Sequence, residues 1–252
     1  MIVVPLENGY HIGYYIYAPQ GRFESCGMFS LPHLISAALC IFLVILLLLF
    51  TSKHIIKTLH IRSAAIVLTV LEAIKIAHSF IYGDLYLDAW FPLSYCGLFI
   101  VALWLSGFGN GIYKRAGEVF ISYGCAFAGL MFLIFPTTSL MLFPIWHYFS
   151  LYSLLFHTAM IFFGIKLLAN EISFTKREYL HYCIFVIAFS AISITLNCAF
   201  ACNLMNLREP FNIPIALLQN IYNAFPAAYT AIALCIYMIV PIFVAFLFKK
   251  LR

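Results

Sequence analysis

The chain has 252 residues, of which 65% are hydrophobic and only 9% are charged, with a formal net charge of +5. A soluble domain carries about 25% charged residues, so this composition excludes an ordinary water-facing surface and indicates an integral membrane protein. The positive charge is small and scattered, which argues against nucleic acid as a partner. The eight cysteines include no CxxC pair, so neither a disulfide framework nor a zinc site is favoured.

In chain order, residues 1–29 form an outer, aromatic-rich segment whose tyrosine content is typical of the lipid–water interface. Residues 30–248 are predicted to form an all-α domain, a bundle of seven transmembrane helices, followed by a basic cytoplasmic tail at 249–252. Residues 208–224 predict an outer loop with a short interfacial or re-entrant helix. The seven predicted spans lie at about 30–51, 63–82, 88–107, 116–135, 145–168, 179–203 and 225–248.

The basic residues are distributed unevenly between the two sides of this arrangement. Because cytoplasmic connections carry an excess of lysine and arginine, the pattern predicts an outer N-terminus and a cytoplasmic C-terminus, which requires an odd number of spans. No cleavable signal is recognisable, so the first span is expected to direct insertion. One side holds 11 of the 14 basic residues: Lys53, Lys57, Arg62, Lys114, Arg115, Lys166, Lys176, Arg177, Lys249, Lys250 and Arg252.

Polar residues within four of the predicted spans recur at helical spacing, so each set shares one face. A polar group facing lipid is costly, and these faces therefore predict a shared polar cavity that opens toward the outer half of the membrane. Purely structural roles stay open as well, because serines also pack between membrane helices and Glu72 and Lys75 can neutralise each other as a pair. The four sets are Glu72, Lys75 and Ser79; Glu118, Ser122 and Cys125; Ser150, Ser153 and His157; and Ser190, Ser193 and Asn197.

The stretch FPLSYCGLF at residues 91–99 holds the most informative cysteine. Pro92 marks where a helix can begin, and Cys96 follows it by four residues. A thiol in this position is either packing material or a nucleophile. An unassisted thiol is mostly protonated, whereas a histidine base would allow it to form a thioester with an acyl donor. Cys198 and Cys202 have the spacing of a metal pair, but no histidine or acid completes it, so no metal site is predicted.

Several segments taken together resemble the YwaF-type integral membrane proteins of bacteria, which are related to an animal seven-helix transmembrane phospholipid acyltransferase. The resemblance covers residues 30–248, and His33 and Glu72 also lie where members of that family tend to have them. The family usually has a histidine where this chain has Ser94. The matching motifs are Pro92-Leu93-Ser94-Tyr95-Cys96, Glu118 with Tyr123-Gly124 and Pro136, His157 in LLFHTAMI, Asn197 with Pro210, and Pro226 to Tyr229.

The resemblance implies a membrane lipid acyltransferase or transacylase in which Cys96 is the nucleophile and His157 the base. From the expected depths of the side chains, His147 is an alternative partner for Cys96. Ser94 or Asn197 would hold the developing oxyanion. Glu72 and Glu118 would orient histidines. With His33 and His147, these four residues make up the predicted substrate-binding set.

Water as the acceptor would instead make the protein a lipid hydrolase. Two non-enzymatic alternatives also remain: a transporter or small-molecule-binding membrane subunit, supported by the polar faces, and a structural scaffold. We expect membrane lipids as substrates, no cofactor and no obligate protein partner. The resemblance to bacterial proteins predicts a multi-pass location in the bacterial plasma membrane.

Overall fold

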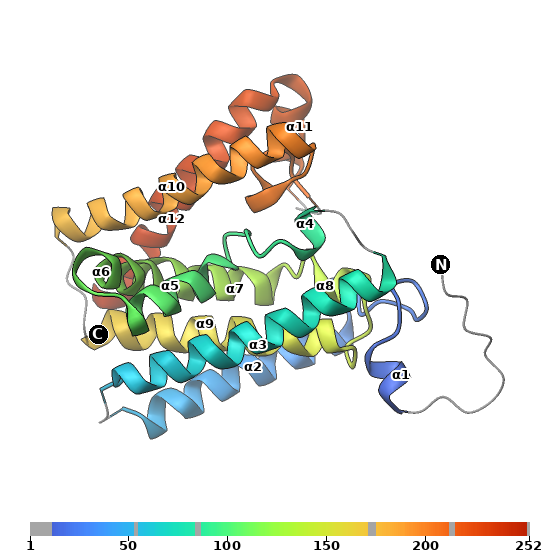
Figure 1. Cartoon of the computed structure of the whole chain (residues 1–252), viewed down its shortest axis with the longest axis horizontal. Helices are drawn as coiled ribbons and strands as arrows, with labels where there is room; N and C mark the ends of the chain where they lie inside the picture. The colour runs from blue at the N-terminus through green and yellow to red at the C-terminus, as the bar shows by residue number, and fades with distance from the viewer. Residues whose placement is uncertain (1–11, 53–54, 84–86, 171–174, 212–214, 251–252) are drawn as a thin grey trace.

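The computed structural model is all-helical and describes residues 12–52, 55–83, 87–170, 175–211 and 215–250 (Figure 1). Six helical segments in these ranges are long and apolar enough to cross a membrane, so the chain is a multi-pass membrane protein by helix length and composition. They coincide with six of the seven predicted spans. The long helices are α2 (Leu31–Phe50), α3 (Thr58–Tyr82), α9 (Tyr148–Asn170), α10 (Lys176–Phe200), α12 (Pro226–Lys250) and the continuous series α6 (Gly111–Phe120), η1 (Ile121–Cys125) and α7 (Ala126–Ile134).

The predicted third span, 88–107, differs from the structure. It consists of the single turn α4 (Leu87–Trp90), a non-helical segment and the shorter helix α5 (Leu98–Phe108). The 11 residues of α5 extend only about 16 Å, roughly half of the hydrocarbon core. Pro92 explains the interruption, because it lacks a backbone N–H and disfavours the helical conformation in Phe91.

The remaining helices are short and lie near the ends of the bundle. The loop with a short helix predicted for residues 208–224 contains α11 (Ala216–Ala224), which buries none of its residues. Of the predicted N-terminal segment, residues 1–11 lie outside the described residues. The other short elements are α1 (Ile12–Ile16), α8 (Ser139–Leu142) and the 3₁₀ turn η2 (Leu204–Asn206).

The chain ends of the long helices divide between two ends of the bundle. The end of α2, the start of α3, the α5–α6 connection and the start of α10 lie together, and we call this the basic end (left in Figure 1). Lys57, Lys114, Arg115 and Lys176 lie in or beside these termini. The elements α1, α8 and α11 lie at the opposite end. Four of the basic residues that the sequence predicts for one side therefore lie at one end of the bundle.

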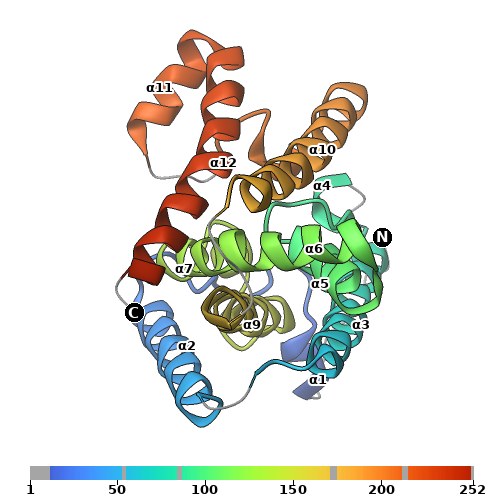
Figure 2. The same ribbon diagram turned by 90° about the vertical axis from the view of Figure 1, so that its left-hand side faces the viewer.

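The helices α7 and α9 occupy the centre of the bundle, and Figure 2 shows α9 with α2, α3, α5 and α7 around it. In their most apolar stretches, 72% of the residues of the α6–α7 series and 67% of those of α9 are buried. The corresponding shares are 11% for α2 and 17% for α12. Glycines permit the close approach of α7 to α9. A Cβ at Gly129 would lie 2.6 Å from Ile161 and 2.8 Å from the carbonyl oxygen of His157. The central pair is thus packed backbone against backbone.

Candidate functional site

Cys96 lies two residues before α5, at the corner where the non-helical segment becomes a helix. The Ser94 hydroxyl accepts a hydrogen bond from the backbone N–H of Gly97 at 2.8 Å, and the Ser94 carbonyl accepts from Leu98 at 3.1 Å. A Cβ at Gly97 would lie 2.7 Å from the Pro92 carbonyl oxygen, so the corner requires glycine there. Ser94 therefore closes the turn that leads into the helix and holds the backbone on both sides of the thiol.

A set of tyrosines surrounds the Cys96 corner. Tyr95 stacks on Tyr237 of α12, with ring centroids 4.6 Å apart, and its hydroxyl lies 2.6 Å from that of Tyr182 in α10. Because the Tyr182 hydroxyl donates to the Tyr237 carbonyl at 2.7 Å, Tyr95 must be the donor to Tyr182. Gly124 of η1 leaves room for this arrangement, since a Cβ there would lie 2.6 Å from the Tyr95 hydroxyl. Tyr95 thereby fixes the neighbouring Cys96 between α5, η1 and α12.

The turn of η1 beside this corner is a π-helix, a local widening that often occurs at functional sites. All five of its residues are buried. The half-buried side chain of Cys96 packs against the core cluster that contains Cys125, the last residue of η1. The corner is therefore packed against an irregular part of a central helix.

His157 lies on α9 and faces α7. Its ring stacks on Phe132, with centroids 3.7 Å apart and planes within 5°. The ring atom Nδ1 lies 2.7 Å from the carbonyl oxygen of Ser153, one turn earlier. Since a carbonyl only accepts, Nδ1 carries the proton and Nε2 carries the lone pair. Within the described residues, Nε2 has no hydrogen-bond partner, so His157 presents a basic nitrogen to the bundle interior.

The other two histidines predicted for the site, His33 and His147, each have both ring nitrogens hydrogen-bonded to backbone groups. His33 accepts from the N–H of Phe29 at 3.0 Å and donates to the carbonyl of Leu133 at 3.0 Å. Each bond occupies a different ring nitrogen, so His33 fastens the start of α2 to the end of α7. It has no lone pair left for proton transfer.

His147, at the start of α9, likewise has both ring nitrogens in hydrogen bonds to the backbone. Its Nδ1 accepts from the N–H of Phe149 at 3.1 Å, and its Nε2 donates to the carbonyl of Ala18 at 3.0 Å. Burial lowers the pKa of His147 to about 4, which keeps the ring neutral. His78, whose ring centroid is 5.5 Å away, contacts the carbonyl of Tyr17 at 3.2 Å through Nε2. The two histidines hold the N-terminal segment on the opposite end of the bundle.

Glu72 and Lys75 of α3 form an ion pair on the face turned toward α9. The hydroxyl of Tyr152 donates to Glu72 at 2.7 Å, so the carboxylate is shared between the lysine and the tyrosine. Among the described residues Glu72 has no histidine partner, and its role in orienting a histidine stays a sequence-based prediction.

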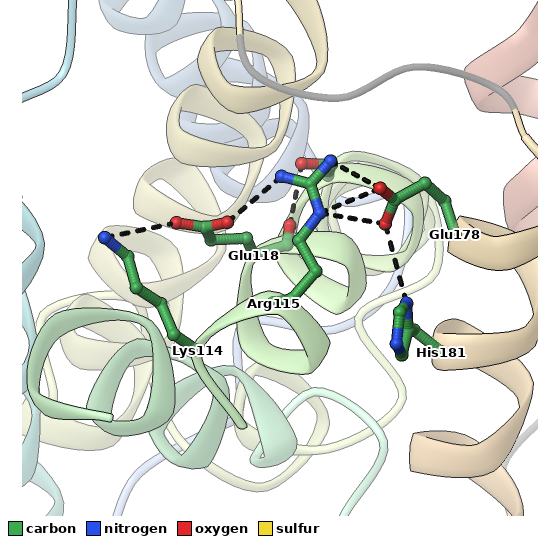
Figure 3. A network of polar contacts seen from close by, with 6 residues as sticks. Lys114, Arg115, Glu118, Glu178 and His181 are labelled. Atoms are coloured by element: carbon green, nitrogen blue, oxygen red, sulfur yellow. Dashed lines mark hydrogen bonds and ion pairs between the residues drawn. The ribbon is translucent and has the colours of Figure 1, made fainter. Parts of the chain in front are cut away.

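Glu118 belongs to a different cluster, at the basic end (Figure 3). Arg115 contacts Glu118 at 3.2 Å and makes a two-pronged interaction with Glu178, with bonds of 2.9 Å from Nε and 2.5 Å from Nη2. Lys114 lies 3.8 Å from Glu118, and His181 lies 3.8 Å from Glu178. This network joins α6 to α10. Glu118 is thus occupied by basic side chains and orients none of His33, His147 and His157.

Asn197 is committed to the chain that follows α10. Its side-chain oxygen accepts from the N–H of Leu204 at 2.7 Å, and its side-chain nitrogen donates to the Leu204 carbonyl at 3.0 Å. The thiol of Cys202 also donates to the side-chain oxygen of Asn197, at 3.3 Å. These bonds hold a turn in which Ala201, Met205 and Asn206 have positive φ angles. Asn197 supports this turn, and its oxyanion role stays a sequence-based prediction.

The serine faces behave differently from one helix to another. The hydroxyls of Ser122 and Ser193 donate to carbonyls four residues earlier in their own helices, at 2.7 and 2.9 Å. This agrees with a packing role for these serines. Ser150 and Ser190 are buried with hydroxyls that lack a partner among the described residues. A hollow on the surface lies elsewhere, lined by Glu209, Pro210, Phe211, Gln219 and Tyr222, and the shared polar cavity stays a sequence-based prediction.

The two proposed catalytic side chains are neighbours of the same central helix series but are not joined. No hydrogen bond links Cys96 Sγ to a His157 nitrogen among the described residues. The backbone of His157 meets Gly129, whereas Cys96 packs against the core cluster that contains Cys125. Those two positions are four residues apart, or about 6 Å along the helix axis. The structure therefore shows Cys96 and His157 as separate groups in the interior of one bundle.

Comparison with known protein families gives a match over residues 28–247, described as the TMEM164 family. The chain belongs to the TMEM164 family. The match covers most of the chain and includes every residue proposed for the site. Neither the comparison with curated proteins nor that with solved structures found a match. The YwaF-type name given to the sequence resemblance is not confirmed.

In this member of the TMEM164 family, the sequence pattern did not reveal the tyrosines. Tyr95 was seen only as part of the PLSYC motif, and Tyr182 and Tyr237 lie 87 and 142 residues further along the chain. Tyr152 could have been found from its spacing, because Tyr148, Tyr152 and Phe156 recur every four residues on one face of α9. Nothing in the local sequence links Arg115 to Glu178, since that contact depends on how α10 packs.

Proposed function

We propose that this TMEM164-family chain is a membrane acyltransferase in which Cys96 carries the acyl group and His157 moves the proton. The proposal rests on family membership, on the sequence resemblance and on one structural observation. That observation is the hydrogen bond between His157 Nδ1 and the Ser153 carbonyl, which leaves Nε2 available as a base. His33 and His147 have both ring nitrogens engaged, so they are poorer candidates.

The first half of the reaction would transfer the acyl group to the protein. Nε2 of His157 takes the proton from the Cys96 thiol, and the thiolate attacks the ester carbonyl of a phospholipid. The carbon–oxygen ester bond then breaks, and the lyso-lipid alcohol leaves with the proton from His157. The product is a thioester on Cys96.

The second half would regenerate the thiol. The hydroxyl of another lyso-lipid gives its proton to His157 and attacks the thioester. The carbon–sulfur bond breaks, and the departing thiolate recovers the proton from the imidazolium. Water in place of the lyso-lipid would yield a free fatty acid, so the same residues serve transfer or hydrolysis.

Chemistry requires Cys96 and His157 to come within about 3–3.5 Å, and catalytic hydrogen bonds often tighten only when substrate is bound. The Cys96 corner would make this adjustment by releasing the contacts of Tyr95 with Tyr182 and Tyr237. It has no regular helix on its N-terminal side, where residues 91–95 link α4 to α5. A lipid chain between α5 and α7 would displace this corner relative to α9.

The proposal includes a seventh passage through the membrane. The turn α4, residues 91–97 and α5 would together form a broken span, which the fold supports because α5 packs beside α3 and leads to the basic end. Irregular backbone at membrane depth is tolerated where protein covers it. The basic end would then face the cytoplasm and the N-terminus the outside, in the plasma membrane of a bacterium.

A second candidate function is a membrane subunit that binds or transports a small molecule without chemistry. The Glu72–Lys75 pair with Tyr152 favours it, because a substrate pathway also needs charged groups inside the bundle. Selective labelling distinguishes the two. A nucleophilic Cys96 reacts with an acyl-type electrophile before the other seven cysteines, whereas a binding subunit shows no such preference.

The test uses purified protein with labelled phospholipid and unlabelled lyso-lipid, and follows acyl exchange in the variants Cys96→Ala and Cys96→Ser. Cys235→Ala is the matched control, since Cys235 is an exposed cysteine of α12. Exchange should disappear in both Cys96 variants and persist in the control. Undiminished exchange in both Cys96 variants would refute the proposed function.

A further inference from the structure

Lys75 is the feature of the interior that the proposed reaction leaves unused. It follows Leu68 and Glu72 on α3 at heptad-like spacing and is followed there by Ser79, and these three neighbours in the row are buried. A lysine in such a row points toward the bundle rather than toward lipid. Its side chain is 26% exposed, so it is half-buried and still reachable.

The contacts of Lys75 leave part of its ammonium group uncommitted. Within the described residues, its one ion-pair partner is Glu72, and Glu72 also accepts from Tyr152. An ammonium has three N–H donors, so two remain for another acceptor. Arg115 differs, because it spends its donors on two carboxylates at the basic end. If the Glu72–Lys75 pair served only to neutralise its own charges, the donors of Lys75 would be expected to be bonded as those of Arg115 are.

The depth of Lys75 matches the order of groups in a phospholipid. It lies seven residues before Tyr82, the last residue of α3, or about 10 Å below that end of the helix. His157 lies nine residues into α9, or about 14 Å below the same end of the bundle. In a glycerophospholipid the phosphate is attached on the headgroup side of the ester carbonyls. A lipid entering from that end would therefore meet Lys75 with its phosphate before its ester reached His157.

We propose that Lys75, held by Glu72 and Tyr152, binds the phosphate of a glycerophospholipid substrate, an inference that rests on the proposed acyltransferase function. The spare N–H donors of the ammonium bond to the phosphate oxygens. Glu72 keeps the lysine from turning toward lipid, and Tyr152 keeps Glu72 in place. Lys75 is thus a binding residue that selects phosphate-containing acyl donors and acceptors.

The experiment measures binding in a Cys96→Ala background, where no acyl transfer can complicate the result. The probes are lysophosphatidylcholine, a monoacylglycerol with the same acyl chain, and glycerol phosphate without a chain. Thermal stabilisation of the detergent-solubilised protein reports binding. Lys75→Gln should weaken binding of lysophosphatidylcholine about tenfold or more and leave that of monoacylglycerol unchanged. Lys75→Arg should retain the binding, and Lys176→Gln at the basic end is the matched control.

The outcomes separate this inference from the proposed function. A selective loss for the phosphate lipid in Lys75→Gln supports the site even if Cys96 proves to be non-catalytic. An equal loss for both lipids, or no loss for either, overturns the phosphate assignment even if Cys96 carries the acyl group. Equal stabilisation by glycerol phosphate and by the lipid would overturn a lipid headgroup as the ligand.

Discussion

The two clusters of charged side chains differ in how fully their hydrogen-bonding groups are used. At the basic end, Arg115 satisfies Glu118 and Glu178 together and joins two helices (Figure 3). Nearer the opposite end, Lys75 has a single charged partner within the described residues. The histidines divide in the same way, since His147 is closed by backbone groups and His157 retains a basic nitrogen. We call a group closed when all of its hydrogen-bonding atoms have partners and open when a donor or acceptor is unused. Closed groups hold the fold together, and open groups can bind a substrate.

The largest expected effect comes from an open group. His157→Gln should slow acyl transfer by about 100- to 10,000-fold, because it removes the proton acceptor for Cys96. The free energy of unfolding should fall by only about 1–2 kcal/mol, the loss of one stacked pair. Single-turnover exchange and chemical denaturation measure the two quantities. A variant that unfolds yet shows normal exchange in its folded fraction would place His157 among the closed groups.

Arg115→Ala should have the next largest effect and the opposite character. It leaves Glu178, a buried carboxylate, without its partner and should destabilise the protein by about 3 kcal/mol. Arg115→Lys keeps a charge but loses the two-pronged geometry, so it should be intermediate. Labelling of Cys96 per folded molecule should stay constant in both. A change in labelling without a change in stability would contradict the structural assignment.

The buried, hydrogen-bonded ring of His147 predicts that the stability of the protein depends on pH. Its pKa in the folded protein, about 4, is below the value of about 6.5 expected in an unfolded chain. The unfolded chain therefore binds more protons between these values, so stability is complete above about pH 6.5 and declines as the pH falls toward 4. Thermal unfolding measured across this range should show the decline, and His147→Asn should flatten it. An unchanged slope in the variant would assign the acid sensitivity to another group.

The smallest effect is expected at Ser94. Ser94→Ala removes the acceptor for the Gly97 N–H and should cost about 1 kcal/mol of stability. Exchange per folded molecule should change less than about threefold. If exchange fell a hundredfold at unchanged stability, Ser94 would hold the oxyanion, as one of the two sequence-based hypotheses states.

Hydrophobic length and composition were sufficient to predict the six long helices, because each needs only an uninterrupted apolar stretch. The third predicted span is not a continuous helix, and the reason is local: apolar residues continue through 88–107, but Pro92 and the Gly97 corner break the helix there. Hydropathy averages over such a break and does not register it.

The candidate site was less predictable than the helices. Spacing along one helix placed Glu72 and Lys75 together, and the structure confirms that pair. It could not show that Asn197 bonds to Leu204 or that both nitrogens of His33 are used, because those partners come from turns and from other helices. Local periodicity places residues on a face, whereas partners depend on packing between distant segments.

The most direct test of the central claim is to look for the acyl group on the protein. Incubation with phospholipid in the absence of acceptor, followed by mass spectrometry of peptides, should find a fatty acyl thioester on Cys96 that neutral hydroxylamine removes. Adding lyso-lipid should discharge it. Acyl exchange that proceeds with no acyl group on Cys96, or with the group on another residue, would contradict the account.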